Sequence, residues 1–141
     1  MLPFCLMNLC SEGKRGKNLM DAVKHVLFVD DEEEVLKILV DYFSDSGYEL
    51  HIAKGTEEAL QIVNKIPVDL VFSDLRLKDG LGSDLLTVVK TARPRAVRML
   101  TSGYLDIRFG KIHEDQKDGT LYLSKPWDLT ALKHIIAQRI G

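Results

Sequence analysis

Cysteine is scarce in this chain: among its 141 residues only Cys5 and Cys10 carry a thiol, and both lie near the N-terminus. A disulfide framework through the body of the chain is therefore not expected, and a reducing, cytoplasmic compartment fits better. No apolar run approaches the length of a membrane span, and the opening residues lack the features of a signal peptide. The formal net charge is only -2, so no basic field predicts direct binding to nucleic acid.

The composition is that of a globular protein. Hydrophobic residues make up 45% of the chain and charged residues 28%, a balance that fits neither a disordered nor a membrane-embedded protein. The length suits one domain with a core of its own. Residues 1–22 are polar and glycine-bearing around their middle, and we expect a flexible leader there. The folded domain is expected over residues 23–141.

Short apolar segments alternate with segments of helical periodicity along this domain. The first apolar segment, 25–29, lacks polar alternation, as strands buried on both faces do. Such a succession predicts an α/β fold, doubly wound, with helices on both faces of a parallel sheet. The weakest helix is the fourth, which contains Gly110 and has a poor apolar stripe. The expected strands are 25–29, 49–53, 68–72, 96–100 and 120–123, and the expected helices are 31–45, 56–64, 83–91, 105–116 and 128–140. Thr56 and Asp128 are expected to cap the second and last of these helices, and Trp127 to be a packing residue at the start of the last one.

Polar side chains stand where these strands end. Asp30 and Asp31 follow the first strand and Asp74 the third, while Thr101 ends the fourth and Lys125 the fifth. Parallel sheets of this kind place their sites beyond the carboxyl ends of their strands, so these residues should meet. Carboxylates crowded about 5 Å apart repel by roughly 3 kcal/mol per pair. The group therefore predicts a small hard cation, Mg²⁺ or Mn²⁺, and an aspartate nucleophile in phosphoryl transfer.

Each of these residues also has a structural interpretation when it is taken alone. Adjacent aspartates can simply begin a helix, and a lysine after a strand is usually a solvated surface charge. The glycines of segment 80–82 match turn chemistry and neither of the glycine-rich phosphate-binding patterns. The histidines have no metal-ligand spacing and are interpreted as structural; they are His25, His51, His113 and His134. Only the joint occurrence of the strand-end residues predicts a function.

That joint pattern resembles the receiver domains of response regulators, the two-component signalling family that includes the chemotaxis regulators. The resemblance covers residues 24–140 and implies a flavodoxin-like sheet with strand order 2-1-3-4-5. It also implies a signalling protein that turns over no external substrate. Four sequence blocks carry it: Val29-Asp-Asp-Glu32, Phe72-Ser-Asp-Leu-Arg-Leu77, Leu100-Thr-Ser-Gly103 and Leu123-Ser-Lys-Pro-Trp127.

The resemblance implies a role for each residue of the site. Asp74 would be the phosphorylated aspartate. Asp31 would bind the cation directly, Asp30 partly through water, and Asp74 and the backbone carbonyl of Arg76 would complete the protein ligands. Lys125 would pair with Asp74 or its phosphate, and the Lys125–Pro126 peptide would be cis.

The resemblance further implies a switch and its partners. Thr101 would contact the phosphoryl group, and Thr101 and Tyr122 would transmit its arrival to the face of helix four, strand five and helix five. A sensor histidine kinase or phosphotransfer protein would supply phosphate, an effector protein or domain would read that face, and a homodimer is one further assembly. Arg76 and Gly103 occupy positions that tune phosphate lifetime in the family. Lys78 stands where the family often has proline, which leaves the rigidity of that loop open.

Two other functions compete with this interpretation. A haloacid-dehalogenase-like phosphohydrolase also uses an aspartate nucleophile and Mg²⁺, but it needs an Asp-x-Asp pair after strand one, where this chain has adjacent Asp30 and Asp31. A receiver-like module that signals without phosphate is the second. The intact acidic pair, acceptor, hydroxyl and lysine argue against it.

Overall fold

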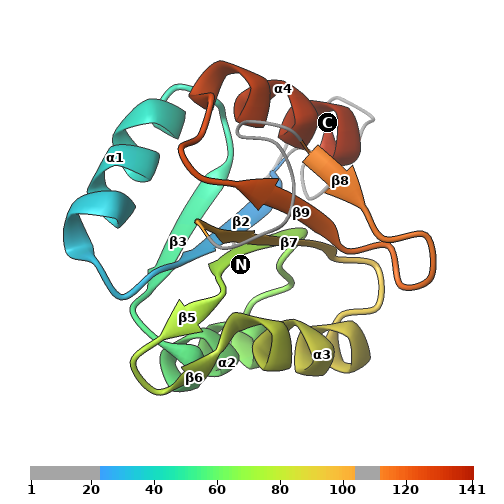
Figure 1. The fold of residues 1–141 in the computed structure, drawn as a ribbon. Coiled ribbons are helices and arrows are strands. Elements are labelled where there is room, and N and C mark those ends of the chain that lie inside the picture. The colour runs from blue at the N-terminus through green and yellow to red at the C-terminus, as the bar shows by residue number, and fades with distance from the viewer. Residues whose placement is uncertain (1–22, 104–111) are drawn as a thin grey trace, which may run out of the picture.

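The computed structural model describes residues 23–103 and 112–141, and the expected leader, 1–22, lies outside them. In chain order the elements are β2 (His25–Val29), α1 (Glu33–Phe43), β3 (Glu49–Ala53), α2 (Thr56–Lys65), β4 (Leu70–Asp74), β5 (Arg76–Leu77), β6 (Gly80–Leu81), α3 (Gly82–Ala92), β7 (Val97–Ser102), β8 (Ile112–Glu114), β9 (Leu121–Ser124) and α4 (Leu129–Ile140). Helices and strands alternate from β2 to β4, as the sequence predicted, whereas short strands follow one another after β4 and after β7 (Figure 1).

A six-stranded sheet forms the centre of the molecule, in the order β3-β2-β4-β7-β9-β8. Its first five strands pair in parallel, and their order matches the predicted 2-1-3-4-5. The sixth strand, β8, pairs antiparallel with β9 and was not expected. The predicted α/β class and the parallel core of the sheet are thus confirmed.

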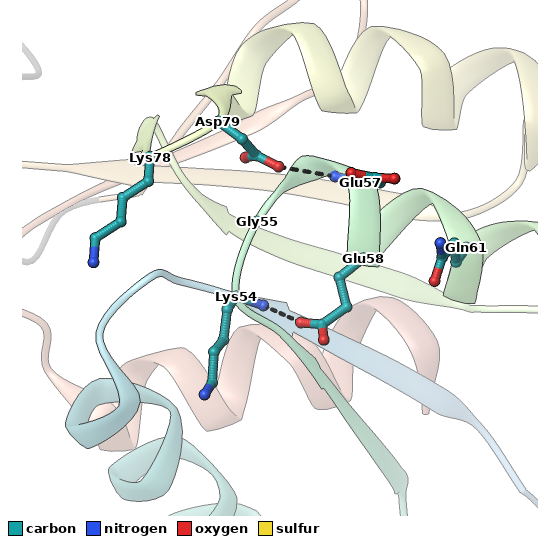
Figure 2. Close-up of a pocket in the computed structure, with 7 residues that line it drawn as sticks. All are labelled: Lys54, Gly55, Glu57, Glu58, Gln61, Lys78 and Asp79. Atoms are coloured by element: carbon teal, nitrogen blue, oxygen red, sulfur yellow. Dashed lines mark hydrogen bonds between the residues drawn. The ribbon is translucent and has the colours of Figure 1, made fainter.

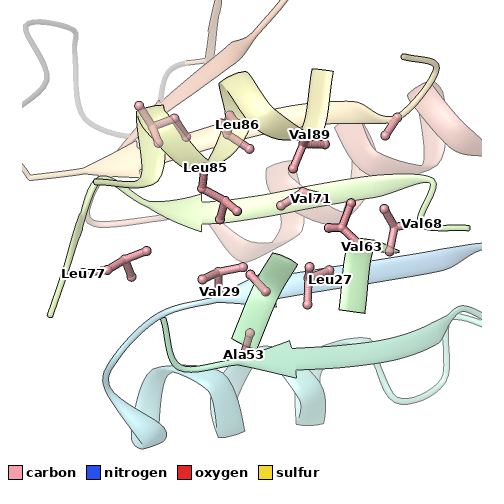
Figure 3. Close-up of a cluster of buried hydrophobic side chains, with 13 residues drawn as sticks. Leu27, Val29, Ala53, Val63, Val68, Val71, Leu77, Leu85, Leu86 and Val89 are labelled. Carbon is pink, nitrogen blue, oxygen red and sulfur yellow. The ribbon is translucent and has the colours of Figure 1, made fainter. Parts of the chain in front are cut away.

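Each face of the sheet has its own apolar core. One core lies between the sheet and helices α2 and α3, and Leu27, Val71 and Val89 are fully buried in it (Figure 3). The other lies under α1 and α4, where Phe28, Phe43 and Ile136 are fully buried. Burial on both faces explains the unbroken apolar runs 26–29 in β2 and 70–72 in β4. The central strands are thereby fixed, and with them the residues at their carboxyl ends.

The predicted fourth helix, 105–116, is wrong where the structure describes it. Residues 104–111 lie outside the described part, but Ile112–Glu114 is a strand and not a helix. These three residues satisfy the outer backbone groups of β9, which would otherwise form an open sheet edge. Arg139 of α4 also forms an ion pair of 2.9 Å with Glu114. Pairing to β9 therefore outweighs the weak helical pattern of this segment.

The helix starts give one confirmation and one correction. Asp128 caps α4 as predicted, because its Oδ1 accepts the backbone N–H of Ala131 at 3.1 Å. Thr56 was expected to cap the second helix, but it is the first residue of α2, and the carboxylate of Asp79 caps that helix instead. Asp79 accepts the N–H groups of Thr56 at 2.8 Å and Glu57 at 3.2 Å. A cap supplied from a distant loop leaves no local sequence signal.

Among the described residues, no helix combines the length and apolar character that crossing a bilayer requires.

Candidate functional site

Three carboxylates converge at the carboxyl ends of β2 and β4. Asp30 and Asp31 follow β2, and Asp74 is the last residue of β4. One carboxylate oxygen of each residue lies within 4.8 Å of those of the other two. The structure thus brings together the three acidic residues that the sequence singled out. All of the side-chain atoms that they could offer a metal ion are carboxylate oxygens.

Asp30 is the most constrained member of this acidic cluster. Its backbone N–H donates to the carbonyl of Ala53 at 3.1 Å, and its Oδ1 accepts the N–H of Glu32 at 2.9 Å. The residue is only 2% exposed. Its carboxylate is therefore held in a fixed orientation toward the cluster, before α1 begins at Glu33.

Lys125 supplies a positive charge to the same place. Its Nζ lies 3.6 Å from Oδ1 of Asp74 and 3.9 Å from Oδ2 of Asp30. Its backbone N–H donates to the carbonyl of Ser102 at 3.2 Å, which ties the loop after β9 to the end of β7. The Lys125–Pro126 peptide is cis, as the resemblance implied.

The charges of the cluster do not balance without a further cation. Burial raises the pKa of Asp74, while Lys125 and a backbone hydrogen bond at Leu75 oppose that rise. Burial also raises the pKa of Asp30, with Asp74 adding to the rise and the N–H of Glu32 opposing it. Two carboxylates 4.8 Å apart repel by roughly 3 kcal/mol at an effective dielectric constant near 20. Three such groups with one lysine form a set that a divalent cation with oxygen preference fits.

Thr101 lies beside Asp74, the expected phosphoacceptor. It pairs with Asp74 in the ladder between β4 and β7, is 1% exposed, and shares the face of the sheet that α1 and α4 cover. Its Oγ1 accepts a hydrogen bond of 2.6 Å from Nε1 of Trp127. The sequence had assigned Trp127 to packing alone. The signal available was chemical: an indole N–H at a partly buried position needs an acceptor.

Gly82 lies against the backbone of Asp74, and the sequence had indicated only turn chemistry for this glycine. A Cβ built at Gly82 would lie 2.1 Å from the carbonyl oxygen of Asp74 and 2.7 Å from Oγ of Ser73. The N–H of Gly82 donates to the carbonyl of Leu75 at 2.7 Å. Only a residue without a side chain permits α3 to begin so close to the end of β4.

The loop after Asp74 is ordered by backbone pairing and needs no proline at Lys78. Arg76 pairs with Leu81 and Leu77 with Gly80, which makes a small antiparallel ribbon of β5 and β6. The N–H of Leu75 also donates to the carbonyl of Thr101 at 2.8 Å. Arg76 is exposed in this ribbon, and the role of its carbonyl as a metal ligand stays a prediction.

A polar hollow of about 400 Å³ lies beside this ribbon, at the start of α2 (Figure 2). Asp79 already occupies the N-terminus of that helix, and two backbone N–H groups lower the pKa of its carboxyl. The N–H of Lys54 is likewise bonded to Glu58 at 2.6 Å. The backbone N–H groups at this helix start therefore already have hydrogen-bond partners within the protein, and the residues of the acidic cluster do not line the hollow.

The two expected switch residues lie on opposite faces of the sheet. Thr101 bonds Trp127, whose ring packs with the core under α1 and α4, whereas Tyr122 packs against the core under α2 and α3. Tyr122 is partly buried, and burial is the main cause that raises its pKa. Its ring centroid lies 6.3 Å from that of His113 in β8. Coupling between Thr101 and Tyr122 stays a prediction.

Comparisons with known proteins agree with this geometry. The family model described as "Response regulator receiver domain" matches residues 26–137. The chain is 32% identical over 117 residues to the photosynthetic apparatus regulatory protein RegA of Cereibacter sphaeroides, covering 83% of this chain and 63% of RegA. It is 31% identical over 113 residues to the response regulator protein PilR of Pseudomonas aeruginosa, covering 79% of this chain and 25% of PilR.

Solved structures show the same likeness. The receiver domain of the hybrid histidine kinase CckA superposes with a TM-score of 0.69 at 28% identity, covering 83% of this chain and 99% of that one. A CheY-like receiver protein from Methanospirillum hungatei reaches a TM-score of 0.71 at 24% identity, over 84% of this chain and 94% of its own. The chain thus spans less than two thirds of the length of the curated relatives RegA and PilR. It belongs to the response regulator receiver domain family of two-component signalling, in which a phosphoacceptor role is typical.

Proposed function

We propose that Asp74 accepts a phosphoryl group, from a sensor histidine kinase or phosphotransfer protein or from a small donor such as acetyl phosphate, and that this changes the binding of a partner. One observation carries the proposal. One carboxylate oxygen from each of Asp30, Asp31 and Asp74 lies within 4.8 Å of the other two, and the ammonium of Lys125 lies 3.6 Å from Oδ1 of Asp74.

The transfer needs no general base, because the nucleophile is a carboxylate. An oxygen of Asp74 forms a bond to phosphorus, while the bond from phosphorus to the donor breaks. The electron pair of that bond leaves with the imidazole of a phosphohistidine or with acetate. Lys125 stands where it can neutralise negative charge on the transferred group, acting as a point charge.

The acidic cluster would hold Mg²⁺ or Mn²⁺ through Asp31 directly, through Asp30 partly by way of water, and through Asp74 and the carbonyl of Arg76. The set of oxygen donors supports this choice of metal. When bound, the cation would screen the negative charge that a phosphoryl donor brings to the carboxylates.

The output surface would be formed by α4, β9 and β8, since β8 occupies the position where a fourth helix was expected. An effector protein or domain would read that surface, with Thr101 and Tyr122 reporting the phosphorylated state. The protein would act in the cytoplasm and turn over no external substrate. Homodimerisation remains a further proposal for the same surface.

The test is phosphorylation with Mg²⁺ and acetyl phosphate, followed by intact-mass measurement. Wild type should gain one base-labile phosphoryl group, and Asp74→Asn should gain none. Asp84→Asn is the matched control, because Asp84 is an exposed aspartate of α3 and should leave the reaction unchanged. A modification that persists in Asp74→Asn, or depends on Asp84, would contradict the assignment.

The rival functions give different results in the same assay. A module that signals without phosphate would remain unmodified and would fail to bind beryllofluoride with Mg²⁺. A phosphohydrolase would release inorganic phosphate from phosphoesters through many turnovers.

A further inference from the structure

The indole of Trp127 connects three parts of the proposed phosphoacceptor site. Its N–H donates to Oγ1 of Thr101 at 2.6 Å, and its ring lies against Phe72, with centroids 5.2 Å apart. Nζ of Lys125 lies 5.5 Å from the centroid of the same ring. Phe72 belongs to β4, two residues before Asp74, so the ring is fixed by the strand that bears the acceptor.

The direction of the hydrogen bond decides what Thr101 can still do. An indole N–H is only a donor, whereas a threonine hydroxyl has one proton and two acceptor sites. Trp127 therefore occupies an acceptor site of Thr101 and leaves its proton free. Phosphoryl oxygens are acceptors, so this proton is what Thr101 would offer them. The two hydrogen bonds are compatible, and donation into a hydroxyl strengthens its own donation.

We infer that Trp127 is a positioning residue for phosphorylation: by donating to Thr101 it holds the hydroxyl with its proton available to a phosphoryl group on Asp74. This inference rests on the proposed function of Asp74. Thr101 is 1% exposed, so bulk water has little access to the hydroxyl and the indole N–H is the donor that the protein supplies to it. Pairing of Thr101 with Asp74 in the β4–β7 ladder places the oriented hydroxyl beside the acceptor.

A double-mutant cycle separates the hydrogen bond from the packing of the ring. Trp127→Phe keeps an aromatic ring against Phe72 but removes the donor, and Thr101→Val removes the acceptor. We expect Trp127→Phe to slow phosphorylation by acetyl phosphate roughly three- to tenfold, the effect of losing one hydrogen bond. In the Thr101→Val background the same substitution should have almost no further effect.

Three outcomes of the cycle would overturn the inference. An unchanged rate in Trp127→Phe would show that the bond has no role, and a faster rate would show that it restrains Thr101. The same fold-change in both backgrounds would show that the ring acts by packing alone. Thr120→Val is the matched control, because it removes a buried hydroxyl and its 3.0 Å bond from Arg98 at the far end of β9, and it should leave the rate unchanged.

A second measurement does not require Trp127 to be replaced. The chain has one tryptophan, so its indole N–H gives a single, assignable NMR signal. Slow hydrogen exchange of this signal should be lost in Thr101→Val. The slow exchange should persist in wild type with Mg²⁺ and beryllofluoride, because the inference requires Trp127 to keep its bond in the phosphorylated state. Rapid exchange in unmodified wild type, or after beryllofluoride binding, would contradict the inference.

Failure of the inference differs from failure of the proposed function. If wild type gains no phosphoryl group, or if Asp74→Asn still gains one, the proposed function is wrong. If Trp127→Phe is phosphorylated as fast as wild type while Asp74→Asn is not phosphorylated, the proposed function stands and the positioning role does not.

Discussion

The substitution Gly82→Ala tests how the backbone of Asp74, the proposed phosphoacceptor, is held in place. The added methyl would lie 2.1 Å from the carbonyl oxygen of Asp74, far inside the 3.4 Å at which ordinary contact begins. Either α3 or the end of β4 must therefore move by about an ångström. Because both are packed elements, the overpacking should cost roughly 1–3 kcal/mol of stability. Alanine gains at most about 1 kcal/mol of helix propensity over glycine, which does not offset the upper part of that range.

The same displacement should also slow phosphorylation. A misplacement of about 1 Å can reduce a rate by roughly two orders of magnitude. We therefore expect Gly82→Ala to unfold at lower urea concentration and to be phosphorylated by acetyl phosphate far more slowly than wild type. Gly103→Ala is the control for stability, because a Cβ there meets nothing within 4 Å. Wild-type stability together with a wild-type rate in Gly82→Ala would refute the close approach and its role.

Two further predictions concern conditions instead of packing. Mg²⁺ at ten times its dissociation constant should stabilise the folded protein by about 1.4 kcal/mol in thermal or urea unfolding, and Asp31→Asn should lose most of that gain; equal gains would place the cation elsewhere. Ring nitrogens of His25 and His51 lie 3.1 Å apart, and burial, then the neighbouring His25, lowers the pKa of His51. Because His51 then binds a proton more readily in the unfolded chain than in the folded one, the free energy of unfolding should have its full value above about pH 6.5 and should fall at lower pH. His51→Gln should show a smaller loss between about pH 7.5 and 5.5 than wild type or the exposed control His134→Gln, and equal losses would contradict the assignment.

The sequence predicted the parallel core of the sheet because burial on both faces leaves a direct trace. Residues 26–29 and 70–72 are apolar throughout, since side chains above and below the sheet both enter a core. Once the strands were found, the site followed from topology, because parallel strands bring their carboxyl ends together. That is why Asp30, Asp31 and Asp74, from distant parts of the chain, could be grouped before any coordinates were known.

The failures share a different cause: each depends on a partner outside the helix, strand or turn in which the residue itself lies. Residues 112–114 are a strand because β9 offers them an open edge, and a local helical pattern does not contain that information. The cap of α2 comes from Asp79, more than twenty residues beyond the helix start. Gly82 was interpreted as a turn glycine because the carbonyl that it approaches belongs to Asp74, at the end of β4, and not to its own turn. Trp127 looked like a packing residue because its acceptor lies in β7.

The segment Lys125-Pro126-Trp127 places an ammonium beside Asp74 and an indole beside Thr101 within a span of three residues. The positions of both groups depend on their spacing from the end of β9 at Ser124. Inserting or deleting a single residue there would shift both groups at once, even if the composition of the segment were preserved. This connection is therefore defined by its length as much as by its residue types, unlike most surface loops, which tolerate insertions.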